Sequence, residues 1–329
     1  MKSISDQILL ELAALRQKTK PSNQEFHIFY KLLDYLKDEI SFEHETYLVW
    51  VFTKVEKGLK EARNGSDNLA KYHLEQIIQN NELNPMANFA FDFIVYPAKA
   101  FYLYNNLSSY DDAISILVKA IKSINAISEV HPEMISASIE QYLNICRVLI
   151  RKNDNVTAIN EFGKLISFML SGICETDLVP IGSKGTLNKL DELEKISMLD
   201  YVTDVSINKI IKSNDNAEKL LKALWDSINQ SHYTFKDSYS ISYHACFRLA
   251  IASEPASQTF NEELLEPLPN LFLLPNTLQY LFLKKIQNHF ESDSRVNESI
   301  EDYINNKLNV SYLLASGSDK LHQSPLRGT

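Results

Sequence analysis

The chain has 329 residues, of which 45% are hydrophobic and 23% charged, and its formal net charge is −9. The length allows one elongated repeat domain or two compact domains. The acidic residues are dispersed along the chain, as on a solvated surface, and an acidic protein repels a phosphate backbone. The composition therefore argues against nucleic acid as a partner.

Glycine and proline are scarce, with 8 and 10 residues, and valine-rich alternating runs are few. This composition is typical of helices, so we predict an all-α fold with more than half of the residues in helices. No apolar run approaches the ~18 residues of a membrane-spanning helix. The first residues include an early acidic side chain and no small-residue cleavage site, so we expect neither a secretory signal nor a membrane partner.

Three cysteines, Cys146, Cys174 and Cys246, are an odd number at wide spacings. No pair has the close spacing of a metal site. Cys146 and Cys246 lie in apolar helical stretches, where a thiol acts as a small buried hydrophobe. The pattern fits a reducing compartment, so we expect a cytoplasmic protein.

Apolar residues recur at helical spacing from the N-terminus onward. Ile8, Leu12 and Leu15 form the stripe of a first helix, and Asn64-Gly65 is typical of a helix end. We expect Pro97 to kink its helix or to start the next turn. The helices predicted for this part of the chain span 4–18, 24–40, 42–63, 67–80 and 86–96.

The segment 98–170 is predicted to form two successive helical hairpins. In each, an apolar helix is followed by a short polar break and a second helix that starts near a small residue, Ala113 or Ala158. Loops this short force neighbouring helices to run antiparallel. The buried stripes of the second helices are Ala113, Leu117, Ala120, Ile121 and Ile124 in one hairpin, and Ala158, Phe162, Leu165, Ile166 and Met169 in the other.

These small residues recur along the chain. Ala113 follows Ala70 by 43 residues, Ala158 follows after a further 45, and Ala217 after a further 59. A period that drifts around 43 residues indicates stacked helical hairpins. The alternative is an irregular helical domain in which the alanine spacing is coincidental.

At these positions the chain resembles the tetratricopeptide repeat family, in which aromatic, leucine and small residues hold fixed places. The resemblance rests on Tyr104, Leu107, Tyr110, Ala113, Leu117 and Ala120 in one hairpin and on Tyr142, Cys146, Ala158 and Phe162 in the next. It is incomplete, because that family repeats every ~34 residues and has a terminal proline that is missing here. The resemblance implies a right-handed α-solenoid of antiparallel helical hairpins.

The remainder of the chain is predicted to be helical up to a polar tail. We expect a single helical-repeat domain over 1–315, with the loop 175–187 as a point of subdivision, and a disordered tail at 316–329. The loop contains Gly182 and Gly185 but lacks phosphate-loop spacing, so we interpret it as a connector. The helices predicted beyond it span 187–213, 216–230, 237–252, 276–290 and 296–308, with a proline-punctuated irregular segment at 264–274.

Motifs for catalysis and cofactor binding are missing from the sequence. The eight histidines are scattered, and no nucleophile elbow, Rossmann glycine pattern or metal-ligand spacing occurs. We therefore predict a non-enzymatic protein- or peptide-binding module without cofactor or metal. The alternative is an all-helical enzyme or enzyme subunit whose catalytic residues are distant in sequence.

The resemblance also implies a binding surface, because in tetratricopeptide proteins the first helix of each pair lines a concave groove. Counting back 11 residues from each small residue, and then one turn further along, gives the positions from which six candidates are taken: Tyr102, Asn105, Asn106, Arg147, Arg151 and Lys209. They are predicted to form a locally positive strip suited to an acidic peptide or a chain terminus. The alternative is that Arg147 and Arg151 are ordinary solvated residues that pair with nearby acids.

Overall fold

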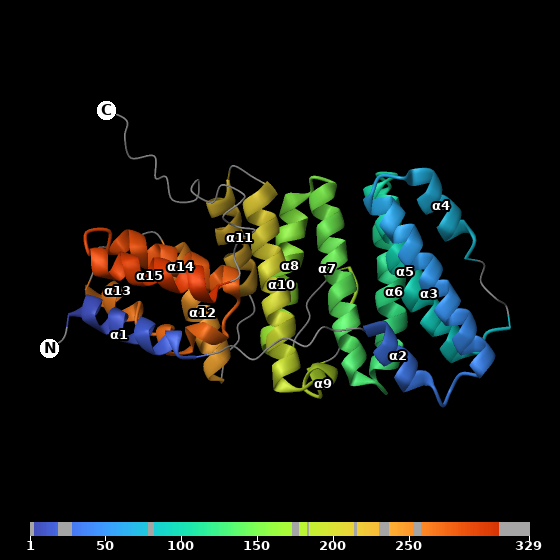
Figure 1. Ribbon diagram of the computed structural model, residues 1–329, viewed down its shortest axis with the longest axis horizontal. Coiled ribbons are helices and arrows are strands. Elements are labelled where there is room, and N and C mark those ends of the chain that lie inside the picture. Colours follow the sequence, from blue (N-terminus) through green and yellow to red (C-terminus); the bar gives the residue numbers. More distant parts are fainter. Residues whose placement is uncertain are drawn as a thin grey trace. The chain divides into compact units, whose positions relative to one another are not determined.

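The computed structural model describes residues 3–18, 28–77, 82–172, 178–182, 184–213, 216–229, 237–252 and 258–308. Within these ranges the chain forms fifteen α-helices and two short 3-10 helices, and no strand (Figure 1). The predicted all-α fold is confirmed. The predicted tail at 316–329 lies outside the described residues.

The helix bounds agree with the sequence periodicity along most of the chain. The first eight helices are α1 Ile4–Arg16, α2 Ile28–Leu36, α3 Phe42–Arg63, α4 Asp67–Glu75, α5 Pro85–Asn105, α6 Tyr110–Ser128, α7 Ile135–Arg151 and α8 Asn155–Ser171. The others are α9 Lys184–Leu187, α10 Glu192–Ser213, α11 Ala217–Asn229, α12 Ser238–Ile251, α13 Gln258–Glu263, α14 Asn276–His289 and α15 Ser294–Lys307. The 3-10 helices are η1 Pro132–Met134 and η2 Leu268–Leu273.

The chain divides into two compact units. We call residues 24–192 the inserted unit, and residues 1–23 together with 193–329 the terminal unit, because the first lies within the sequence of the second. The boundary falls shortly after the loop 175–187, where a subdivision is predicted. The single domain over 1–315 stays a prediction.

The turns of the inserted unit repeat a common geometry. At Gly65, after α3, and at Asn153, after α7, the backbone has φ angles of 76° and 65°. In both turns the amide of the following residue, Ser66 or Asp154, donates to a carbonyl in the last helical turn at 2.9 Å. This is the Schellman arrangement, which satisfies the free carbonyls of a helix end and turns the chain back. Asn and Gly at these positions are the residues that tolerate the left-handed conformation.

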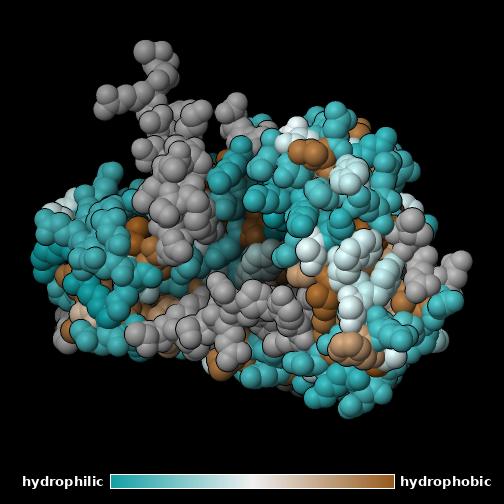
Figure 2. Space-filling view, turned by 45° about the vertical axis from the view of Figure 1, so that its right-hand side comes forward, coloured by the Kyte–Doolittle hydropathy of each residue, from teal (hydrophilic) through white to brown (hydrophobic). Residues whose placement is uncertain are grey.

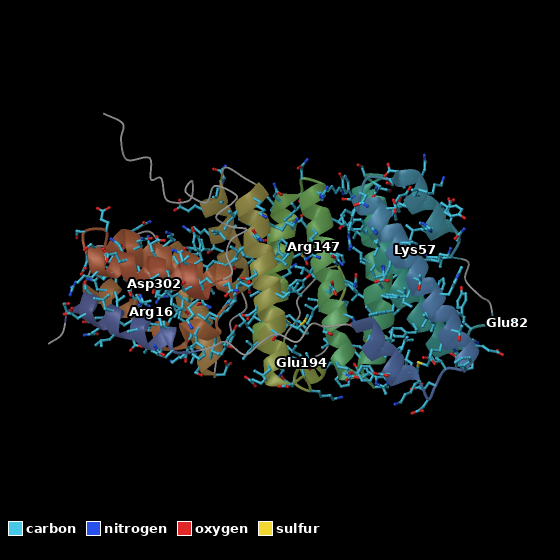
Figure 3. The ribbon with its side chains drawn as sticks, viewed as in Figure 1. Arg16, Lys57, Glu82, Arg147, Glu194 and Asp302 are labelled. Carbon is cyan, nitrogen blue, oxygen red and sulfur yellow. The ribbon has the colours of Figure 1, made fainter. Side chains whose placement is uncertain are left out.

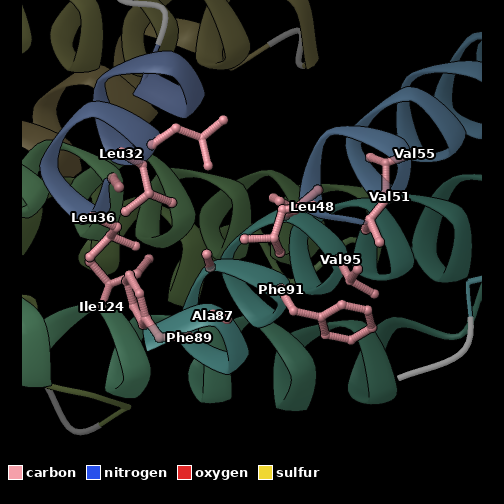
Figure 4. Close-up of a cluster of buried hydrophobic side chains, with 14 of the residues drawn as sticks. Leu32, Leu36, Leu48, Val51, Val55, Ala87, Phe89, Phe91, Val95 and Ile124 are labelled. Carbon is pink, nitrogen blue, oxygen red and sulfur yellow. The ribbon is translucent and has the colours of Figure 1, made fainter. Parts of the chain in front are cut away.

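One cluster of apolar side chains forms part of the core of the inserted unit (Figure 4). The small residues predicted to lie on buried stripes do so, since Ala70, Ala113 and Ala158 are all fully buried. Alanine at such positions lets helix backbones approach closely. Cluster members shown in Figure 4 come from α2 (Leu32, Leu36), α3 (Leu48, Val51, Val55), α5 (Ala87, Phe89, Phe91, Val95) and α6 (Ile124).

The helix α5 extends beyond its predicted bounds of 86–96, and of the two expectations for Pro97 the start of a next turn is wrong. It runs without interruption from Pro85 to Asn105, so Pro97 neither ends it nor starts a new element. Proline lacks an amide hydrogen and leaves the carbonyl four residues earlier, that of Phe93, without its usual helical donor. The helix persists because its apolar residues on both sides of Pro97, including Val95, Ala98 and Ala100, are buried. The burial of these side chains outweighs the loss of one helical hydrogen bond.

Part of the connector 175–187 packs onto the inserted unit. Val179 and Ile181 are buried, and the Asn125 side-chain amide donates to the Pro180 carbonyl at 2.6 Å. A Cβ atom on Gly182 would lie 2.0 Å from the end of the Ile135 side chain, so the backbone passes close to α7. The described residues of this loop therefore serve packing.

The terminal unit joins the two ends of the chain. Helix α1 packs on α15 and η2, although α1 and α15 are separated by most of the sequence (Figure 1). The Arg16 guanidinium donates to the Ser299 carbonyl and hydroxyl at 3.2 and 3.1 Å and pairs with Asp302 at 3.0 Å (Figure 3). Ile8, Leu12 and Leu15 on α1 are buried. The apolar face of α1 is therefore buried against helices from the other end of the sequence.

A buried polar network links α10 to α12 and α14. The hydroxyls of Thr203 and Tyr243 are 2.8 Å apart, and the Tyr239 hydroxyl donates to Asp200 at 3.3 Å. Asp204 accepts the amide and the hydroxyl of Thr277, at 2.9 and 2.5 Å, at the start of α14. Burial raises the pKa of both tyrosines, so both hydroxyls stay neutral. These bonds orient the three helices.

We predict that Ala113→Leu overpacks the contact made by α6 and lowers the free energy of unfolding by about 1–3 kcal/mol. The matched control is Ala126→Leu, which makes the same change at an exposed position on the same helix. Chemical denaturation of both variants measures the difference. Equal stability of the two variants would contradict the assigned packing of Ala113.

We predict that Leu12→Ala destabilises the terminal unit by about 2–5 kcal/mol, because Leu12 is fully buried where α1 packs. Leu10→Ala is the control, since Leu10 on the same helix is 51% exposed and should change stability little. Thermal denaturation followed by circular dichroism measures both. A Leu12 variant that melts like wild type would show that α1 is not docked.

Candidate binding pocket

A cavity of about 400 Å³ lies in the inserted unit, between the first helices of successive pairs. We call it the α3–α5–α7 pocket. Its lining comes from Phe52, Val55, Leu59 and Arg63 on α3, from Phe93, Ile94, Pro97, Ala98, Phe101 and Tyr104 on α5, and from Ala137, Glu140, Gln141, Asn144 and Arg147 on α7.

Apart from Arg63 and Tyr104, the walls contributed by α3 and α5 are apolar, and they rest directly on the core. Val55, Ile94 and Ala98 belong to the buried cluster, and Phe52 and Phe93 are half-buried and pack against it. On the face shown in Figure 2, the described surface is largely hydrophilic, and hydrophobic side chains are exposed in limited areas. A pocket wall anchored in the core in this way is held rigid by packing.

The wall contributed by α7 is polar and internally ordered. The Arg147 guanidinium donates to the Asn144 side-chain oxygen at 2.7 Å, and the Asn144 amide nitrogen donates to the Gln141 oxygen at 3.1 Å. Because arginine can only donate, this chain fixes the orientation of both amide groups. The three side chains follow at intervals of three residues on one helix face. Figure 3 shows Arg147 on this helix.

Positive charge gathers at one end of the pocket. Arg63, Arg147 and Arg151 all act on the Tyr104 hydroxyl through their charges. Burial raises the pKa of Tyr104, and the three arginines oppose that rise without cancelling it. The Arg63 guanidinium lies 5.5 Å from the centre of the Phe101 ring, a cation–π distance. Arg63 and Arg151 are exposed, and neither forms an ion pair with a carboxylate of the described chain.

A single acidic group, Glu140, stands in the pocket wall two helical turns before Arg147. Burial raises the pKa of its carboxyl, and the charge of Arg147 opposes the rise only in part. Within the described residues it has no hydrogen-bond or ion-pair partner. The pocket therefore combines an apolar wall, a cationic end and one desolvated carboxyl.

The structure places the six predicted site residues in different surroundings. Arg147 lines the pocket, and Arg151 lies one turn beyond it at the end of α7. Tyr102 packs against the core cluster. Asn106 caps α5 and donates to the Ala62 carbonyl at 3.2 Å and to Asp67 at 2.5 Å, while Asn105 donates to Asn106 at 3.2 Å. The sixth residue, Lys209, belongs to α10 in the terminal unit.

The positions on α5 are displaced for a structural reason. The connections after α3 and α7 comprise residues 64–66 and 152–154, whereas that after α5 comprises 106–109, one residue more. Counting back 11 residues from Ala113 therefore gives Tyr102, one position after Phe101, which occupies the equivalent place on α5. Phe101 and Tyr104 line the pocket, in place of the predicted Tyr102 and Asn105.

Sequence reasoning missed Arg63, Tyr104 and Glu140 as pocket residues. A signal for the first existed, because counting back 11 residues from Ala70 gives Leu59, a lining residue, and Arg63 lies one turn further along. Glu140 lies two turns before Arg147 on the same helix face, so helical spacing also pointed to it. Nothing in the sequence indicated that the Glu140 carboxyl has no hydrogen-bond or ion-pair partner among the described residues.

The described cysteines are unsuited to nucleophilic chemistry. Cys146 and Cys246 are free and fully buried, and burial raises the pKa of each thiol well above its ordinary value. A thiol held protonated is a poor nucleophile. In the described ranges, no three His, Cys, Asp or Glu side chains lie close enough together to hold a metal ion. No described helix is long and apolar enough to cross a membrane.

The fold class of the described chain is all-α. Comparison with protein-family models, with curated proteins and with solved structures gave no match. The resemblance to tetratricopeptide repeats therefore rests on the residues quoted for it and stays a prediction.

We predict that Glu140→Gln raises the free energy of unfolding at neutral pH, because it removes a carboxylate whose ionisation the folded state disfavours. A raised folded-state pKa means that the native protein binds more protons than the unfolded chain above pH ~4.5. Wild type therefore loses stability relative to the variant as pH rises through the Glu140 pKa. Urea denaturation between pH 4 and 8 measures this.

The control for that series is Glu56→Gln, an exposed glutamate in the middle of α3. It should show no such relative dependence on pH. If Glu140→Gln is less stable than wild type at neutral pH, the carboxylate has a stabilising partner and the assignment is wrong.

We also predict that both described thiols resist modification in the folded protein. In a Cys174→Ser background, an aromatic disulfide reagent at neutral pH should react with Cys146 and Cys246 only after denaturant is added. Release of the coloured product measures the reaction. Rapid reaction of the native variant would contradict the burial of these side chains.

Proposed function

We propose that this chain is a non-enzymatic protein- or peptide-binding module, and that the α3–α5–α7 pocket is its binding site. The observation that supports this most directly is the pocket itself, lined in succession by three helices that each precede a small-residue helix. Its cationic end suits a ligand with a carboxylate, either an acidic side chain or a chain terminus.

We further propose that the inserted unit is built as a right-handed solenoid of antiparallel hairpins, similar to tetratricopeptide repeats. Successive helices pack in order from α5 to α8, α3 also packs on α4, and the first helices of neighbouring pairs, α3 with α5 and α5 with α7, are in contact. The equivalent turns after α3 and α7 support a repeated unit. Such arrays present the first helix of each pair on a concave binding face.

The composition of the pocket favours binding over catalysis. Its titratable groups are one carboxyl, one tyrosine and two arginines, with no nucleophile next to a base. A catalytic centre usually brings convergent acid and base groups together. An apolar wall with a few fixed polar groups is instead typical of a recognition site.

The test is a charge reversal at the cationic end. We predict that Arg147→Glu with Arg151→Glu weakens binding of an acidic peptide library by about tenfold or more, since attraction becomes repulsion. The probe is a mixture of terminally blocked, fluorescein-labelled peptides with one fixed glutamate and random neighbours, measured by fluorescence anisotropy. Salt should weaken binding to the wild type.

The matched control is Lys119→Glu with Lys122→Glu, which changes the net charge equally at exposed positions on α6 outside the pocket. It should bind the acidic library like wild type. Unchanged affinity of the folded arginine double variant would place the binding site elsewhere.

A further inference from the structure

Two partly or fully buried glutamates of the inserted unit have contrasting surroundings. Glu161 on α8 accepts a hydrogen bond from the Tyr142 hydroxyl and pairs with Lys164 at 2.9 Å. Glu140 on α7 lines the α3–α5–α7 pocket, and no residue of the described chain forms a hydrogen bond or ion pair with its carboxyl. The Glu161 carboxylate therefore has hydrogen-bond and ion-pair partners within the fold, whereas the Glu140 carboxylate has none among the described residues.

The Glu140 side chain is half-buried. A ligand that covers the pocket would remove the remaining water from its carboxylate, and a donor on that ligand would offset the cost. The neighbours of Glu140 in the pocket do not offer that donor. Arg147 donates to Asn144, and Asn144 donates to Gln141, so these bonds run along α7 without including the Glu140 carboxyl. Opposite α7, the side chains of α3 and α5 that line the pocket are apolar except for Arg63 and Tyr104 at its cationic end.

We propose that the pocket binds a peptide segment with charges of both signs, in which a basic side chain pairs with Glu140 and an acidic one with Arg147 and its neighbouring arginines. A bulky apolar side chain between the two charges would pack on the wall that includes Phe93, Pro97 and Phe101. This inference rests on the proposed binding function and adds the chemistry of its ligand.

The spacing of the two pocket charges sets the spacing in the ligand. Glu140 and Arg147 are seven residues apart on one helix, so their Cα atoms are separated by about 10.5 Å along its axis. In a polyproline II segment, side chains three positions apart lie on one face and are about 9 Å apart. The proposed ligand therefore has a lysine or arginine and an acidic residue three positions apart.

The arrangement also gives selectivity against simpler acidic ligands. An acidic peptide without the basic residue can satisfy the arginines but leaves Glu140 desolvated when the ligand covers it. Leaving a buried charge unpaired is more costly than losing a neutral hydrogen bond. The pocket should therefore distinguish bipolar from purely acidic segments even though both carry the carboxylate.

The test compares two peptide libraries on the wild-type protein by fluorescence anisotropy. Both are terminally blocked and have random neighbours around a fixed glutamate, with either lysine (bipolar library) or glutamine (acidic library) three positions before it. We expect the bipolar library to bind about tenfold more tightly, the size of one hydrogen bond to a charged group. In Glu140→Gln the two libraries should bind with similar affinity, whereas Glu56→Gln should keep the wild-type preference.

The outcomes separate this inference from the function on which it rests. Equal binding of the two libraries to wild type, or a preference that survives in Glu140→Gln, overturns the bipolar ligand while the peptide-binding function stands. Failure of both libraries to bind overturns the binding function and this inference with it. Because glutamine has nearly the same shape as glutamate, circular dichroism and melting of the variant confirm that it is folded before binding is measured.

Discussion

Close packing of helices at alanine is the constraint on which the inserted unit depends. Ala70, Ala113 and Ala158 are fully buried on the second helices of three successive pairs. Because each of these side chains is fully enclosed, a larger residue there would overpack the core between the helices. The first helices α3, α5 and α7 are thereby held next to one another, and the pocket is the space that their side chains leave between them.

The terminal unit is held together by contacts between the two ends of the sequence. In an ideal solenoid each repeat contacts only its neighbours, so its stability comes from local interfaces. Here α1 packs on α15 and η2, and Arg16 donates to Ser299 and Asp302 across nearly the whole sequence. Contacts of this range must wait until both ends of the chain exist and meet. The two units therefore differ in how their folding depends on chain connectivity.

Two glutamates of the inserted unit, Glu161 and Glu140, have opposite surroundings. Glu161 has the Tyr142 hydroxyl and the Lys164 ammonium as partners and ties α7 to α8. Glu140 has neither, and burial raises its pKa. A group that disfavours folding is expected at a site whose partner comes from outside, since binding sites commonly carry such a cost in stability.

The sequence by itself determined the helices, because apolar periodicity, caps and left-handed turn residues are local properties. It identified α3, α12, α14 and α15 nearly to the residue, as well as the burial of Ala113, Ala158 and Cys146. Only the tertiary structure decided that α5 continues through Pro97, that one extra residue after α5 shifts its pocket face, and that α1 docks on α15. These features depend on burial and on contacts between distant segments. The same holds for the pocket, where Arg63, Arg147 and Glu140 line one cavity only because α3 and α7 flank α5.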